Sequence, residues 1–123
     1  MLESKLNKLL ANYAVEYHKL QTLHWYVKDH AFFQAHAKLE DYYNEAHEAV
    51  DEIAEKLRMI GGKPLANMGE FKANATISEA KGEFVTQKQA LATAKADFEQ
   101  LLADVKDIDR KSTRLNSSHQ PLS

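Results

Sequence analysis

The chain contains no cysteine, four glycines and two prolines among its 123 residues, and it has no long apolar run. The absence of cysteine excludes disulfide bonds, thiolate metal sites and iron–sulfur clusters, and it fits a reducing cytosol. No segment approaches the roughly 20 apolar residues that span a membrane, and the N-terminus lacks the apolar core of a signal peptide. These absences predict a cytoplasmic protein without a membrane partner.

An excess of charge of one sign is also missing, because 16 Lys and Arg stand against 18 Asp and Glu, for a formal net charge of −2. This balance gives no overall attraction to nucleic acid or to an anionic membrane. The length allows one domain at most. Because helix breakers are few and Ala, Leu, Lys and Glu are abundant, the fold class is all-α.

Apolar side chains recur at three- and four-residue steps in three segments, 2–27, 32–60 and 82–108. This period predicts three long amphipathic helices. Gly61-Gly62-Lys63-Pro64 predicts the end of the second helix, because glycine adopts the left-handed cap conformation and proline cannot continue a helix. We expect the long connection 65–82 to cross the end or side of a bundle and to contain a short helix.

The C-terminal segment 109–123 has no helical apolar period, and most of it can be back-translated into a common short-read sequencing adapter read in frame. We interpret 109–123 as translated adapter sequence, disordered and outside the fold; the alternative is a natural polar, disordered tail. Residues 1–108 then form an incomplete domain. A four-helix bundle without its last helix leaves apolar faces uncovered, so we expect the natural protein to continue beyond Ile108.

Two of the predicted helices carry side chains that commonly bind metal ions. His24 lies on the apolar stripe of the first helix, and the second helix carries His36 with Glu40 and Asp51 with Glu55. Each of these pairs is spaced i, i+4 and lies on one helix face. Imidazole and carboxylate ligands suit iron, zinc or manganese, and a helical bundle can hold such a metal without cysteine. Together the five residues predict a metal site.

Each ligand candidate also has a structural explanation. A lone histidine on an apolar stripe, such as His24, is more often a hydrogen-bonded core residue than a ligand. A carboxylate pair such as Asp51 and Glu55 is usually a solvated face or a partner for a nearby lysine. His36 with Glu40 is more specific, since it places a nitrogen and an oxygen ligand one turn apart.

The spacing along the second helix predicts how the ligands combine. Glu40 and Asp51 are separated by roughly 16 Å at 1.5 Å per residue, so one ion cannot bind both pairs of a single helix. Both pairs point the same way, because their angular offset is only about 20°. A two-fold axis between antiparallel copies brings the His36 end of one chain to the Asp51 end of the other. We therefore expect an intersubunit site in which one subunit supplies the histidines and its mate supplies Asp51 and Glu55.

Motifs between residues 24 and 64 resemble those of a known family. The motifs that carry the resemblance are His24-Trp25-Tyr26-Val27-Lys28, Phe32-Phe33, His36, Glu40, Asp51-Glu52-Ile53-Ala54-Glu55 and Ile60-Gly61-Gly62-Lys63-Pro64. Together they are similar to the Dps family, the ferritin-like mini-ferritins of bacteria, over residues 2–108. The resemblance implies a ferritin-like four-helix bundle, here with the fourth helix missing, and a hollow dodecamer as the complete assembly.

The resemblance also implies an activity. Dps proteins oxidise Fe(II), preferably with hydrogen peroxide, and store the ferric mineral inside the shell, so iron is the implied metal. The family's metal-binding residues match His24, His36, Asp51 and Glu55, with a second acidic position at Glu40. The implied role is that of a bacterial, cytoplasmic ferroxidase in iron storage and defence against oxidative stress.

The termini of the chain bear on whether DNA is a partner. Family members that bind DNA commonly carry a terminal arm rich in Lys and Arg, whereas this chain begins almost directly in its first helix with only Lys5 and Lys8. The termini therefore do not support DNA as a partner. The alternatives to a ferroxidase are a non-catalytic helical bundle that binds a partner or packs through its polar face, and an inactive truncated fragment.

Overall fold

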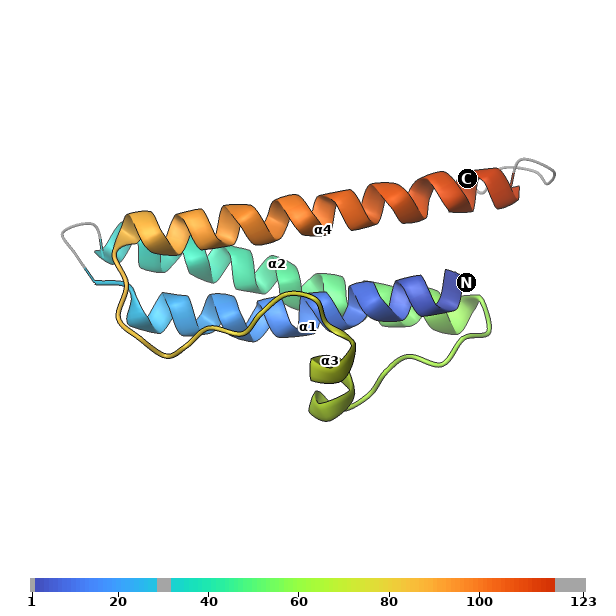
Figure 1. The fold of residues 1–123 in the computed structure, drawn as a ribbon, viewed down its shortest axis with the longest axis horizontal. Coiled ribbons are helices and arrows are strands. Elements are labelled where there is room, and N and C mark those ends of the chain that lie inside the picture. Colours follow the sequence, from blue (N-terminus) through green and yellow to red (C-terminus); the bar gives the residue numbers. More distant parts are fainter. Residues whose placement is uncertain (1, 29–31, 117–123) are drawn as a thin grey trace.

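The computed structural model describes residues 2–28 and 32–116, which are mostly helical. Figure 1 shows three long helices side by side and one short helix in the connection that precedes the last of them. The helices are α1 (Leu2–Tyr26), α2 (Phe32–Met59), α3 (Met68–Asn74) and α4 (Gln87–Asn116). The structure confirms the predicted all-α class, with three long helices and a short helix in the crossover.

The helix directions follow from the lengths of the connections. A short connection joins α1 to α2, and these two helices run antiparallel (Figure 1). The long connection after α2 passes through α3 and returns along α1, so α4 runs parallel to α2 (Figure 1). An isolated parallel β-bridge between Val27 and Val85 fastens the end of this crossover to the end of α1. The crossover therefore places the start of α4 beside the last turn of α1.

The end of α2 is set by glycine, as the sequence predicts. Gly61 has a φ of +81°, a conformation that glycine adopts without the steric cost of a Cβ. Gly61 N donates to Arg58 O at 3.1 Å, and Gly62 N donates to Leu57 O at 2.8 Å. This pair of hydrogen bonds is a Schellman cap, which satisfies carbonyl groups that the end of the helix leaves without partners.

The start of α4 differs from the prediction. The helix begins at Gln87, whereas the apolar period placed its start at residue 82. Thr86 Oγ1 accepts a hydrogen bond from Gln89 N at 3.1 Å, and Gln89 Oε1 accepts one from Thr86 N at 2.9 Å. This reciprocal arrangement is a capping box, which fixes the first turn. Val85, just before the capping box, pairs with Val27 at the end of α1 and is therefore not available to the helix.

The far end of α4 corrects a second expectation. The segment 109–123 was expected to be disordered, but α4 continues through Asn116. Residues 109–116 contain neither glycine nor proline, so an existing helix can extend through them at one backbone hydrogen bond per residue added. Residues 117–123 lie outside the described residues. The adapter origin of the segment remains a prediction.

Two buried apolar clusters hold the three long helices together. One contains Leu20, Leu23, Val27, Ala35, Leu39, Ala46, Ala90 and Ala94. The other contains Leu6, Leu9, Leu10, Ile53, Leu57, Ile77 and Leu101. Both clusters contain residues of α1, α2 and α4, and α1 is the central helix because it packs against each of the other three helices. Within residues 2–28 and 32–116, no helix combines the length and the low polarity that a membrane span requires.

Asn12 fastens the crossover to α1. Its side chain is fully buried, and Oδ1 accepts hydrogen bonds from Thr76 N at 2.7 Å and Ile77 N at 3.1 Å. Asn12 Nδ2 donates to Thr76 Oγ1 at 3.1 Å, and Gln100 Nε2 of α4 donates to the same hydroxyl at 2.6 Å. The buried Asn12 amide therefore links α1 to the crossover, and the Thr76 hydroxyl links the crossover to α4.

Replacing Asn12 should loosen this link. Asn12→Ala leaves the backbone N–H groups of Thr76 and Ile77 without their acceptor, and the Ile77 bond is buried. We therefore expect a loss of about 2–4 kcal/mol in the free energy of unfolding. A shift of the urea midpoint, followed by circular dichroism, measures it. The matched control is Asn74→Ala, which removes an exposed hydrogen bond to Glu70 O and should change stability by at most about 0.5 kcal/mol. Equal midpoints for the two variants would contradict the role of Asn12.

Candidate metal centre

His24 and His36 face each other between two helices. His24 lies in the last turn of α1, and His36 lies near the start of α2. Their rings stack with centroids 3.4 Å apart at an interplanar angle of 20°. His24 is 6% exposed, and His36 is partly buried. The structure thus brings the two histidine ligands predicted from the sequence together within one chain.

Reciprocal hydrogen bonds hold the two rings. His24 Nδ1 lies 2.6 Å from His36 O, and His36 Nδ1 lies 2.8 Å from His24 O. A carbonyl oxygen only accepts, so each Nδ1 carries the proton and donates. In a neutral ring of this tautomer, Nε2 carries the lone pair that can bind a metal. Backbone carbonyls that orient ligating imidazoles in this way are a general feature of metal sites.

Glu40 adds a carboxylate on the same side. It follows His36 by one helical turn, and its Oε1 lies 4.0 Å from His24 Nε2. The carboxylate is about half exposed, so the cluster opens to solvent on this side. One ligand atom from each of His24, His36 and Glu40 lies within 4.8 Å of the other two.

The spacing of these atoms suits one metal ion. Two ligands on the same ion are separated by at most twice the metal–ligand bond, roughly 4.2 Å for bonds of about 2.1 Å. His24 Nε2 and Glu40 Oε1, 4.0 Å apart, already meet this limit, and one ligand atom from each of the three residues lies within 4.8 Å of the others. Two imidazoles and one carboxylate leave further coordination positions for other ligands, as in mononuclear iron sites.

Asp51 and Glu55 are not part of this cluster. Both side chains are exposed on α2, and Asp51 lines an open depression together with His47 and Glu52. Within the described part of the chain, the residues that converge on a metal position are His24, His36 and Glu40. The intersubunit combination of the histidines with Asp51 and Glu55 therefore remains a proposal.

A polar group that the motif reading missed lies inside the bundle. Glu16 is fully buried, and Lys19 Nζ lies 2.9 Å from Asp97 Oδ2 in an ion pair that is also almost buried. Burial raises the pKa of Glu16 to about 10, with the neighbouring Asp97 carboxyl group as the next cause. Glu16 lies between Tyr13 and Leu20 on the apolar stripe of the first helix, and this position is the sequence signal that could have revealed its burial.

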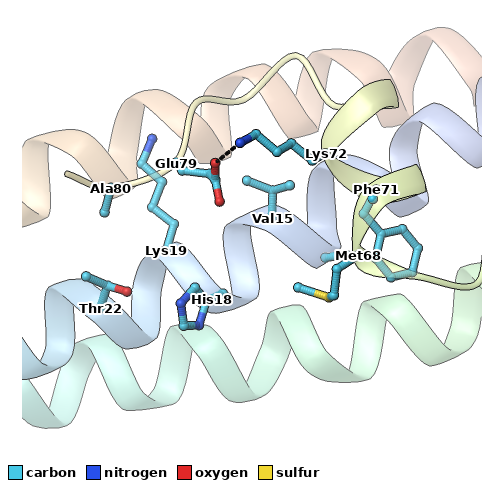
Figure 2. A pocket seen from close by; sticks show the side chains of 11 residues that line it. Val15, His18, Lys19, Thr22, Met68, Phe71, Lys72, Glu79 and Ala80 are labelled. Carbon is cyan, nitrogen blue, oxygen red and sulfur yellow. Dashed lines mark ion pairs between the residues drawn. The ribbon is translucent and has the colours of Figure 1, made fainter. Parts of the chain in front are cut away.

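A separate cavity lies on the other side of α1. It has a volume of about 290 Å³ and lies between α1, α3 and the crossover. Figure 2 shows Lys72 of α3 paired with Glu79 of the crossover, with Phe71 and Met68 on the apolar wall. The other lysine of the lining, Lys19, is paired with Asp97. Because each lysine of the lining already has a carboxylate partner, the cavity offers no evident anion site.

The fold and the site together define a ferritin-like protein. It has three long helices, a crossover that contains a short helix, and a cluster of two histidines and a glutamate between α1 and α2. The family profile "Ferritin", a ferritin-like domain, matches residues 3–114. The DNA protection during starvation protein 2 of Bacillus anthracis is 41% identical over 102 residues, which are 82% of this chain and 68% of that protein.

Solved structures agree with the sequence match. The structure of Dps from Listeria innocua soaked with zinc has a TM-score of 0.89 at 32% identity, covering 96% of this chain and 80% of that one. The Dps protein of Vibrio cholerae O1, described as a member of a superfamily of ferritin-like diiron-carboxylate proteins, has a TM-score of 0.84 at 28% identity, covering 96% and 79%. The chain therefore belongs to the Dps family of ferritin-like proteins, as its motifs predict.

If the cluster between α1 and α2 binds the metal, loss of one of its histidines should weaken metal binding. We expect His24→Ala to weaken the binding of Co(II), used as a spectroscopic probe, by about tenfold or more, because it removes a ligand and the orienting bond to His36. Titration followed by visible absorbance gives the affinity. The matched control is His18→Ala on the same helix, which should bind as the parent chain does. Unchanged affinity in His24→Ala would exclude this cluster as the binding site.

Proposed function

We propose that this protein binds Fe(II) as its substrate and oxidises it with hydrogen peroxide, so that iron is stored and its toxicity is reduced. The observation that carries the proposal is the convergence of His24, His36 and Glu40, with both rings oriented by backbone carbonyls. Membership of the Dps family supports iron as the metal, since its relative from Vibrio cholerae O1 is described as a ferritin-like diiron-carboxylate protein.

The ligand set suits this reaction. Neutral imidazoles bind Fe(II) well, and carboxylates favour the more highly charged Fe(III) product. Hydrogen peroxide takes up two electrons and two protons to give two water molecules, so two Fe(II) ions are oxidised for each peroxide. The exposed side of Glu40 gives peroxide and water a route to the iron. The surrounding anionic surface then leads ferric ions towards the growing mineral.

We further propose that a second copy of the chain completes the site. The single chain offers three ligand atoms, whereas Asp51 and Glu55 lie exposed on α2 without converging on a metal position. An antiparallel two-fold arrangement of α2 helices supplies these carboxylates to the histidines of the other copy and forms the site twice. Further association of such dimers into a hollow dodecamer in the bacterial cytoplasm is part of the same proposal.

Removal of the second histidine tests the activity. In His36→Ala we expect peroxide-driven Fe(II) oxidation to slow by about tenfold or more, because a first-sphere nitrogen ligand is lost. Stopped-flow absorbance of the ferric product measures the rate after anaerobic loading with Fe(II). The control is His18→Ala, which removes an exposed histidine on α1. If His36→Ala oxidises iron as rapidly as the parent, the site assignment is wrong, and a non-catalytic bundle becomes the better reading.

Mixing two inactive variants tests the intersubunit arrangement. His36→Ala and Asp51→Asn place their defects in different halves of the proposed site. After the variants are unfolded together and refolded, a mixed dimer contains one doubly defective site and one intact site. Random pairing then restores about one quarter of the parent rate, because half of the dimers are mixed and half of their sites are intact. Should the mixture stay as inactive as its components, each site belongs to a single chain.

A further inference from the structure

The interior of the bundle contains a carboxylate that no hydrogen bond satisfies. Glu16 on α1 is fully buried, and neither of its side-chain oxygens has a hydrogen-bond partner among the residues that the structure describes. An ionised carboxylate in this position would lose its hydration without compensation, which costs several kcal/mol. Glu16 must therefore be neutralised by a group close to it.

The groups around Glu16 identify what neutralises it. After burial, the carboxyl group of Asp97 on α4 is the largest cause of the raised pKa of Glu16. Asp97 Oδ2 lies 2.9 Å from the Nζ of Lys19, which follows Glu16 by three residues on α1. Oδ2 accepts no well-aligned hydrogen bond, so this contact is an ion pair. With both carboxylates ionised, the three residues carry one negative charge more than Lys19 cancels. Two carboxyl groups can hydrogen bond to each other only when one of them is protonated.

We propose that Glu16 and Asp97 share one proton in the folded protein, and that this proton, together with Lys19, forms a pH-sensitive latch between α1 and α4. The proton supplies the missing donor and makes the trio electrically neutral. The proton resides mainly on Glu16, because Asp97 already has Lys19 as its ion-pair partner. The latch depends on no metal ion and is independent of the ferroxidase proposal.

The titratable groups around Glu16 and Tyr13 come from α1, α2 and α4. From α1, Tyr13 is half buried, and burial raises its pKa, as do the nearby carboxylates Glu45 of α2 and Glu16. Lys19 is the one neighbour that lowers the pKa of Glu16, and burial and Asp97 outweigh it.

The sign of the pH dependence follows from the raised pKa. The pKa of Glu16 is about 10 in the folded chain against an ordinary value of 4.5. Below pH 4.5 both the folded and the unfolded chain hold the proton, so the latch contributes fully. As the pH rises from 4.5 towards 10, the unfolded chain releases the proton first, and the folding equilibrium constant falls by up to about tenfold for each pH unit. The latch is thus closed in acid and opens in alkali.

The first experiment is infrared spectroscopy of the whole protein at pH 7. A protonated carboxyl group gives a C=O stretch that is distinct from that of carboxylates and shifts in heavy water. We expect this band in the parent chain, its loss in Glu16→Gln, and its retention in Glu99→Gln, which makes the same change at an exposed position of α4. Absence of the band from the parent chain would overturn the proposal, and this result needs no variant to fold.

The second experiment is the dependence of stability on pH. Urea unfolding of the parent and of Glu99→Gln should show the same decline in stability from pH 5 to pH 9. Glu16→Gln keeps a hydrogen-bond donor to Asp97 but has no proton to lose. Its folding equilibrium constant should therefore fall less steeply with pH than that of the parent, by up to about tenfold for each pH unit. Parallel declines in all three proteins would overturn the latch. Stability that responds to magnesium and chelator instead of pH would show that a cation neutralises the trio.

Discussion

The reciprocal hydrogen bonds between His24 and His36 connect the end of α1 to the start of α2. Both the junction of these two helices and the geometry of the ligand cluster depend on them. Lys28 N, which would continue α1 by donating to His24 O, donates instead to Val85 O in the crossover. The His24 carbonyl is therefore one of the groups that a helix end leaves without a partner, and His36 Nδ1 donates to it. The imidazole that caps α1 is thereby oriented for a metal, so the same contact serves folding and binding.

The central position of α1 explains why polar groups inside the bundle differ so much in character. Asn12 lies in the interior with its amide satisfied by the crossover and is a purely structural link. Glu16, one helical turn further on, faces the Asp97 carboxyl group of α4 and has no donor of its own. A neutral amide can be satisfied by backbone groups at any pH, whereas a carboxyl group requires a proton or a cation. Two polar residues on one buried helix thus give constant and pH-dependent contributions to stability.

Much of the fold could be predicted because it follows from local rules. The apolar period marks the three long helices, and the predicted end of the second helix at residue 60 lies one residue beyond Met59, where α2 ends. The start of α4 was missed because it depends on the pairing of Val27 with Val85, two residues far apart in the sequence. The helical segment 109–116 was missed because extension of a helix needs only the absence of breakers, which an apolar period does not report.

The candidate site also has features that could be predicted from the sequence and features that could not. His24, His36 and Glu40 were found from residue type and spacing, yet the carbonyls that orient the two rings could not be, because they depend on how α1 meets α2. Asp97 was missed as the partner of Glu16 because the pair joins α1 to a helix whose register against α1 no local pattern specifies. If a second copy supplies Asp51 and Glu55, affinity for iron rises as chains associate and, by linkage, bound iron favours association. Iron would then promote the assembly that stores it.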